Sequence, residues 1–342
     1  MKQNSLLKLI PYLNITALLC VVFIAVSVVA LMMPSSFDFN NPEKAKPAIP
    51  LVVTEVKDTN LWSSPDSTKI PNTPEGDLIR YGRELVAHTA LFLGPSGKVM
   101  AISNGMNCQN CHLKAGKKPF GNNYSGVAAT YPKFRARSGS IESVEKRVND
   151  CIERSLNGKK LDDNSTEMRA FVSYIKWVGS EVTPGVYPKG AGLWDLPPLS
   201  RPADPLKGKE VYKFYCERCH GEEGKGVREN QSIEWRYPPL CNDNSYNTGA
   251  GMYRLSRLAG YVKANMPNGA TFDKPQLTDE EAWDVAAYIN SMPRPTKDLS
   301  KDWPDISTKP FDHPFGPYAD NFSEQQHKYG PFVPIKAVQK KK

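Results

Sequence analysis

The sequence predicts a mostly α-helical protein in which two similar modules follow one another behind a separate apolar N-terminal segment. Three observations support this prediction. A pattern of the form Cys-x-x-Cys-His occurs twice, at 108–112 and at 216–220. Stretches with apolar residues at helical spacing come before and after each copy. Residues 15–33 form an apolar run without a charge, which is long enough to cross a bilayer as a helix.

The repeated pattern is the attachment motif of c-type haem, because its two thiols reach the two vinyl groups of the porphyrin and the following histidine ligates the iron. A zinc or redox Cys-x-x-Cys pair with an incidental histidine is the alternative, and the second copy argues against it. We therefore expect two covalently bound haem c groups in two tandem class I-type cytochrome c domains. The attachment cysteines and proximal ligands are Cys108, Cys111 and His112 for haem 1, and Cys216, Cys219 and His220 for haem 2.

Composition and periodicity divide the 342 residues into five segments. They are a membrane anchor or signal segment at 1–35, a tether at 36–74, the haem 1 domain at 75–185, the haem 2 domain at 186–296 and an irregular tail at 297–342.

The N-terminal segment predicts export. Lys2 and Lys8 precede the apolar run at 15–33, which places the haem domains on the periplasmic side of the inner membrane. No small-x-small cleavage site follows the run, so an uncleaved transmembrane anchor is favoured over a cleaved signal peptide that would leave a soluble periplasmic protein.

Helical spacing of apolar residues predicts the secondary structure of both domains. We expect helices at 77–93, 141–155 and 167–178 in the first domain. In the second we expect helices at 206–215 and 252–264 and a last one that opens at Thr278. Glu281 completes a capping box with Thr278, and Pro293 follows the end of this helix. Gly208 and Tyr212 suit a close helix crossing.

Charge and composition narrow the classes of partner. The formal net charge is +8, which favours an anionic substrate or an acidic redox partner. No nucleic-acid-binding motif accompanies this charge, so we do not expect nucleic acid to be the partner.

The sixth ligand of each iron separates electron carriers from enzymes. Met266 lies in a loop between two expected helices and is the predicted distal ligand of haem 2, with Met252 as the alternative. The first domain has no comparable methionine loop, and His88 on its first helix is a weak candidate.

Cys151 is the other candidate for haem 1, with Arg147 one helical turn before it and Ser155 one turn after it. Four of the seven cysteines form thioethers, which leaves Cys151, Cys241 and an N-terminal cysteine. The residues alone leave two interpretations open. Cys151 and Cys241 form a disulfide, or Cys151 is a thiolate over the first iron, held anionic by the metal and nearby arginines.

The sequence from about 75 to 295 resembles the dihaem thiosulfate dehydrogenases, some of which run chiefly as tetrathionate reductases. The most specific similarity is the segment 147–158, which reads RVNDCIERSLNG, together with YPPL at 237–240, GAGM at 249–252 and NMP at 265–267. Where members of this family carry tryptophan and glycine after Tyr-Pro-Pro-Leu, this chain has Cys241 and Asn242.

The resemblance implies that Cys151 is both the distal ligand of haem 1 and the catalytic thiol, and that Met266 ligates haem 2. It also implies that Arg137 and Arg147 bind the anionic substrate, whereas pairing with haem propionates is the alternative for both. Ser155 would orient the thiol or the substrate. Two thiosulfates would couple to tetrathionate, or the reverse, with Cys151 forming a thiosulfonate adduct. Electrons would pass through the His220/Met266 haem to a small cytochrome c, a membrane oxidase or a quinone-linked protein.

Three other functions compete with this one. A membrane-tethered dihaem electron carrier needs methionine or histidine over both irons. A dihaem peroxidase needs an open haem with distal acid–base groups. A thiosulfate-conjugating cytochrome also has a cysteine-ligated haem, but it works with a partner subunit.

Overall fold

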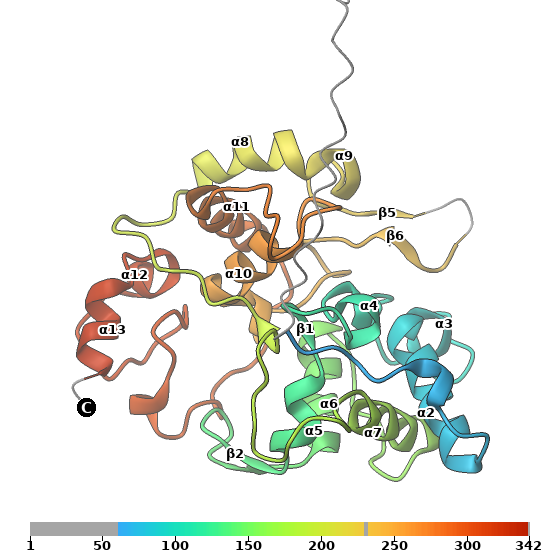
Figure 1. Cartoon of the computed structure of the whole chain (residues 1–342). Helices are drawn as coiled ribbons and strands as arrows, with labels where there is room; N and C mark the ends of the chain where they lie inside the picture. Colours follow the sequence, from blue (N-terminus) through green and yellow to red (C-terminus); the bar gives the residue numbers. More distant parts are fainter. Residues whose placement is uncertain (1–60, 229–231, 341–342) are drawn as a thin grey trace, which may run out of the picture. The chain divides into compact units, whose positions relative to one another are not determined.

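The computed structural model of the protein describes residues 61–228 and 232–340 (Figure 1). The expected N-terminal anchor and most of the tether lie outside these residues. Within the described part, no helix combines the length and the apolarity needed to span a membrane.

Most of the regular structure is helical. The elements up to residue 178, with η denoting 3-10 helices, are η1 (Ser67–Lys69), α2 (Pro74–Ala87), α3 (Thr89–Leu93), η2 (Cys108–Asn110), α4 (Leu113–Gly116), β1 (Gly121–Asn123), α5 (Ser125–Thr130), β2 (Lys133–Arg135), β3 (Ser140–Glu142), α6 (Val144–Ser155) and α7 (Thr166–Val178). Those that follow are β4 (Gly192–Leu193), α8 (Pro205–Tyr215), α9 (Glu217–His220), β5 (Val227–Arg228), β6 (Trp235–Tyr237), η3 (Gly251–Tyr253), α10 (Leu255–Asn265), α11 (Asp279–Ser291), η4 (Ile306–Thr308), α12 (Glu324–Tyr329) and α13 (Val333–Gln339). The described strands pair antiparallel as β1–β4, β2–β3 and β5–β6.

The first hydrophobic core forms where α2 crosses α7 (Figure 1). Gly82 allows the close approach, because a Cβ at this position would lie 2.0 Å from the backbone oxygen of Ala170. Leu85 on α2 and Phe171 on α7 are buried beside the crossing. The N-terminal and C-terminal helices of the first module therefore pack directly on one another.

The single helix expected at 77–93 is broken into α2 and α3 at His88, whose backbone leaves the helical region. The break serves the first haem motif. The Ala90 amide donates to the Asn107 side chain over 2.8 Å, and the Cys108 amide donates to the Thr89 hydroxyl over 2.9 Å. These bonds hold the motif against the start of α3.

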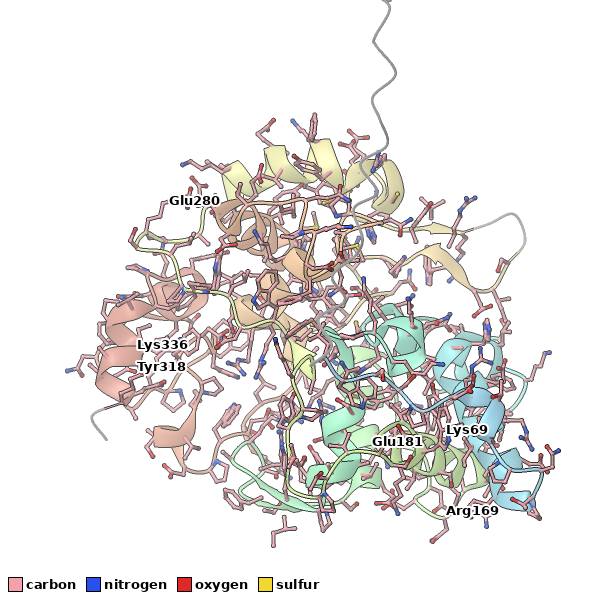
Figure 2. All side chains as sticks on the ribbon, in the orientation of Figure 1. Lys69, Arg169, Glu181, Glu280, Tyr318 and Lys336 are labelled. Atoms are coloured by element: carbon pink, nitrogen blue, oxygen red, sulfur yellow. The ribbon has the colours of Figure 1, made fainter. Side chains whose placement is uncertain are left out.

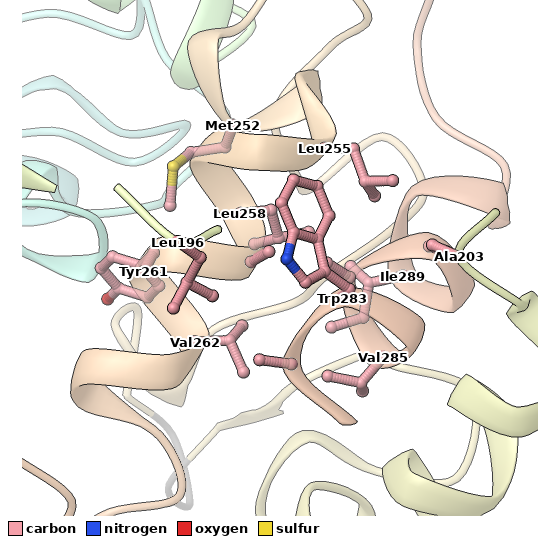
Figure 3. Packing of buried hydrophobic residues seen from close by; sticks show 14 of the residues in the cluster. Leu196, Ala203, Met252, Leu255, Leu258, Tyr261, Val262, Trp283, Val285 and Ile289 are labelled. Atoms are coloured by element: carbon pink, nitrogen blue, oxygen red, sulfur yellow. The ribbon is translucent and has the colours of Figure 1, made fainter. Parts of the chain in front are cut away.

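The second hydrophobic core repeats this arrangement with α8 crossing α11. Gly208 permits the crossing, as its sequence position predicts, since a Cβ there would lie 1.9 Å from the Asp284 backbone oxygen. Trp283 lies in the centre of the cluster among residues such as Leu258 and Ile289 (Figure 3), and its indole nitrogen donates to the Pro197 carbonyl over 2.9 Å. The capping box between Thr278 and Glu281 is formed.

The C-terminal segment differs from the expectation of an irregular tail. It contains η4, α12 and α13, and it buries Phe332 and Ile335 in the second core. Tyr318 (Figure 2) stacks on the His327 ring with the centroids 3.7 Å apart. The apolar residues of this segment are too few and too widely spaced for helical periodicity to predict its short helices. Together, however, these residues complete the second core.

Candidate active site

A cavity of about 300 Å³ adjoins the first haem motif. Cys108, Cys111 and His112 line it from the motif, and Cys151 lines it from α6. Residues far along the chain complete the wall, among them Met252 of η3. The cavity thus brings together residues from both modules.

His112 is oriented from behind by the backbone. Its Nδ1–H donates to the carbonyl of Asn122 over 2.5 Å, and the Tyr124 ring packs on it with centroids 4.7 Å apart. Because Nδ1 is engaged in this bond, Nε2 is the nitrogen left to bind a metal, which is the usual arrangement around a ligating histidine.

Cys151 lies one turn from the end of α6, which Ser143 caps at its start. The Arg147 guanidinium donates to the Cys151 Sγ over 3.2 Å, as residues four apart on one helix face can. Burial alone would raise the pKa of the thiol, but the charge of Arg147 and the neighbouring His112 ring outweigh it and lower the pKa to about 6. Cys151 is therefore a thiolate at neutral pH, and its charge in turn raises the pKa of Arg147.

The cavity is strongly basic. Among its described lining residues Asp150 is the only carboxylate, whereas the cations are Lys133, Arg135, Arg137, Arg147, Arg154, Arg254 and Arg257. Such a wall attracts anions.

Carboxylates hold several of these arginines from behind. Arg137 donates to Asp150 over 2.7 Å, and Arg154 makes a two-pronged pair with Asp302 at 2.7 and 2.8 Å. Arg254 pairs with the buried Asp312. The two bonds to Asp302 fix the plane of the Arg154 guanidinium, and the carboxylates beside Arg137 and Arg254 anchor those side chains. Arg147 differs from these three in bonding directly to the thiol.

The structure brings the four predicted catalytic residues to one cavity, since Cys151, Arg137, Arg147 and Ser155 all line it. Sequence reasoning missed Asp150, although it directly precedes Cys151. It also missed Trp303, which lines the cavity from the C-terminal segment and whose contribution no local pattern indicates.

The second haem motif holds its histidine in the same way as the first. Cys216 and Cys219 form no disulfide, and the Nδ1–H of His220 donates to the Pro238 carbonyl over 2.8 Å. Burial lowers the pKa of His220, which favours the neutral ring that binds metal. Met266 ends α10 and packs, half-buried, against the second core.

Three of the open alternatives can be compared with the structure. The disulfide between Cys151 and Cys241 is not formed, because Cys151 faces the first cavity while the buried Cys241 donates to the Glu223 carbonyl beside the second motif. His88 makes a partly exposed contact with Glu234 and does not line the cavity. Met252 lines the cavity of the first motif and is also buried in the second core, so Met266 and Met252 both stay predictions for the second haem.

The residues at both motifs fit haem c. Each motif offers two cysteines that form no disulfide and a histidine whose Nδ1 bonds to a backbone carbonyl, and at the first motif Cys151 lines the same cavity as the histidine. Apolar side chains such as Val148 and Phe171 line the first cavity beside them. Thioether attachment with one axial histidine is the ligation that this donor set provides.

Comparison with known proteins agrees with the geometry. A family model described as SoxA/TsdA, cytochrome c domain, matches residues 98–183, and one described as cytochrome c matches residues 206–293. The thiosulfate dehydrogenase of Psychrobacter arcticus is 36% identical over 241 residues, which are 70% of this chain and 71% of that protein. The thiosulfate dehydrogenase of Allochromatium vinosum is 34% identical over 239 residues, which are 68% of this chain and 83% of that protein.

A solved structure, the thiosulfate dehydrogenase TsdBA of Marichromatium purpuratum in its as-isolated form, superposes with a TM-score of 0.63 at 31% identity. The match covers 69% of this chain and half of that one. The chain carries two covalently bound haem c groups. It belongs to the thiosulfate dehydrogenase family of dihaem cytochromes c.

Proposed function

We propose that this protein interconverts thiosulfate and tetrathionate at Cys151. The observation that carries the proposal is the position of Cys151, whose sulfur accepts a hydrogen bond from Arg147 over 3.2 Å and shares with His112 a cavity lined by arginines. The family relationship supports the same chemistry, because the relatives are thiosulfate dehydrogenases.

The arginines address the main barrier to this reaction. Two thiosulfate dianions must come together, and like charges at close range repel strongly in a poorly hydrated cavity. Arg137 and Arg147 present fixed positive charge and paired N–H donors that match sulfonate oxygens. The surrounding cations extend this field to the rest of the cavity wall. We assign substrate binding to Arg137 and Arg147, and orientation of the thiol or substrate to Ser155.

The proposed reaction balances without protons. The Cys151 thiolate and the sulfane sulfur of one thiosulfate form an S–S bond and release two electrons. The sulfane sulfur of the second thiosulfate attacks the sulfane sulfur of this adduct, which forms tetrathionate, breaks the bond to Cys151 and expels the Cys151 thiolate. When bound, the two haem groups supply one-electron acceptors for the released electrons. The reverse sequence reduces tetrathionate.

We assign the residues that would hold the two groups from the donor atoms at each motif and, for Met266, from its place after α10 and the family resemblance. His112 and Cys151 would ligate the first iron, and His220 and Met266 the second, with the four motif cysteines providing the thioethers. The electrons would leave toward an external redox partner, either a small cytochrome c, a membrane oxidase or a quinone-linked protein.

The protein would work in the periplasm. Its apolar segment at 15–33, behind Lys2 and Lys8, is the proposed export signal and inner-membrane anchor. Fractionation of cells that produce the full chain tests this assignment. Recovery of the protein in the membrane fraction supports the anchor, and recovery only in the soluble periplasmic fraction contradicts it.

The function is tested by thiosulfate-dependent reduction of an artificial electron acceptor, and by the reverse assay with tetrathionate. We expect activity in the wild type and its loss in Cys151→Ala with both haem groups still attached. Cys241→Ala is the matched control, because it removes a buried thiol outside the cavity, and it should retain activity. An inactive wild type in both directions would leave an electron carrier, and an active Cys151→Ala would remove the thiol from the mechanism.

A further inference from the structure

The start of the C-terminal segment crosses the candidate active site. Asp302 forms the two-pronged pair with Arg154, which lies on the same helix as Cys151. The next residue, Trp303, donates its backbone N–H to the carbonyl of Arg137 over 2.7 Å. This segment follows the two regions that the family models match, which end at residues 183 and 293. Neither cytochrome c domain therefore accounts for it.

Trp303 is held in an unusual backbone conformation. Its φ of +60° lies in the left-handed region, which is costly for a bulky residue. Two neighbours hold it there. Pro304 packs on Gly139, where a Cβ would come within 2.6 Å of the proline ring, and the His313 ring meets the indole edge-on with centroids 5.9 Å apart. This conformation keeps the tryptophan in the wall of the cavity.

The indole N–H of Trp303 is buried, and no described residue accepts a hydrogen bond from it. Leaving such a donor unsatisfied is costly, because the N–H group loses its hydration without gaining a partner. Trp62 and Trp235 also have buried indole nitrogens without a described acceptor, but neither lines the cavity. Trp303 therefore combines an available donor with a position in the basic wall that holds Cys151 and Arg147.

We propose that Trp303 is a further substrate-binding residue, whose indole N–H donates to a sulfonate oxygen of thiosulfate or tetrathionate, and that Asp302 is its positioning residue. The proposal rests on the proposed function. Two anionic groups could accept a hydrogen bond from this donor, namely the sulfonate of the substrate and a haem propionate. The cluster of arginines around Cys151 favours the substrate, because these cations and the indole donor line the same cavity as the reacting thiol.

The test is the Trp303→Phe substitution in the full holoprotein, which keeps the aromatic ring and removes the N–H. A hydrogen bond to a charged group contributes enough that KM for thiosulfate should rise about tenfold or more. We expect kcat to change less than twofold and the midpoint potential of haem 1 to stay at its wild-type value. Trp235→Phe is the matched control and should leave both kinetic constants unchanged.

Other outcomes are equally decisive. An unchanged KM in Trp303→Phe, with an active wild type, would overturn the proposal and leave the proposed function intact. A raised KM with a shifted potential of haem 1 would assign the donor to a propionate. A wild type that is inactive with both substrates would remove the proposed function itself, and this inference with it.

Asp302→Asn provides a second measurement that does not alter the indole. It weakens the pair with Arg154, so we expect KM to rise as Trp303 loses its position. If Asp302 acts through Trp303, the double variant should be no worse than Trp303→Phe alone, because coupled residues are not additive. Additive losses would show that Asp302 acts separately, which would overturn its role as the positioning residue.

Discussion

Replacement of Arg147 by glutamine tests the electrostatic core of the proposed mechanism. This guanidinium donates to the Cys151 sulfur over 3.2 Å and also lines the cavity in which the substrate would bind. Glutamine keeps a polar side chain of moderate length and removes the charge. The variant therefore separates the role of positive charge from the role of packing on α6.

The size of the effect follows from the distance. A substrate anion held about 3 Å from this guanidinium is attracted by about 5 kcal/mol at an effective dielectric constant of about 20. Arg137 stays in the cavity wall, and water can enter the space that the guanidinium leaves, so part of this energy is recovered. A net loss of about 3 kcal/mol corresponds to a fall of about a hundredfold in kcat/KM.

The assay is steady-state oxidation of thiosulfate with an artificial acceptor. We expect kcat/KM of Arg147→Gln to fall about a hundredfold. Arg147→Lys should fall less, because lysine keeps the charge and loses only the planar fork. Haem content and visible spectra identify any variant that is merely misassembled. A fully assembled Arg147→Gln with activity within twofold of the wild type would refute the reasoning.

Three further predictions concern stability and ligation. Gly208→Ala should destabilise the fold by about 3 kcal/mol in chemical unfolding, because its Cβ would overlap the backbone of α11, whereas Gly251→Ala has open space around its Cβ and should be neutral. Burial lowers the pKa of His313 to about 4, whereas the histidine of the unfolded chain takes up a proton below about pH 6.5. The free energy of unfolding should therefore fall by about 3 kcal/mol between pH 6.5 and 4, and His313→Gln should lose this pH dependence. Met266→Ala should lower the midpoint potential of haem 2 in a redox titration, and an unchanged potential would exclude its thioether as ligand.

Local patterns predicted the parts of this fold that depend on neighbouring residues. The two Cys-x-x-Cys-His motifs needed only their own spacing, and the helix around Cys151 follows from its apolar periodicity. Its start was predicted at 141, but residues 140–142 pair with 133–135 as β3 and β2, and Ser143 then caps α6. Strands of three residues are too short for a periodic pattern in the sequence to predict them.

Spacing alone predicted the candidate site at the haem motif and where its residues share one helix. Arg147, Cys151 and Ser155 are spaced by one turn, so their common face follows from helical geometry. The resemblance to a family, rather than any spacing, indicated Arg137. The pairing of Arg154 with Asp302 joins residues 148 positions apart, and no periodicity reports such a contact.

The cavity depends on how the two modules dock, and specific polar contacts determine this docking. Asn247 of the second module bonds to the carbonyls of Glu153 and Arg154, which satisfies backbone groups that the C-terminal end of α6 leaves without helical partners. Tyr261 donates to the Asn110 carbonyl inside the first haem motif over 2.7 Å. Thus the second module supports both the helix that carries Cys151 and the loop of the first haem motif. Because the C-terminal segment then covers the same cavity with Trp303, the candidate site is a product of the whole described chain rather than of its first domain.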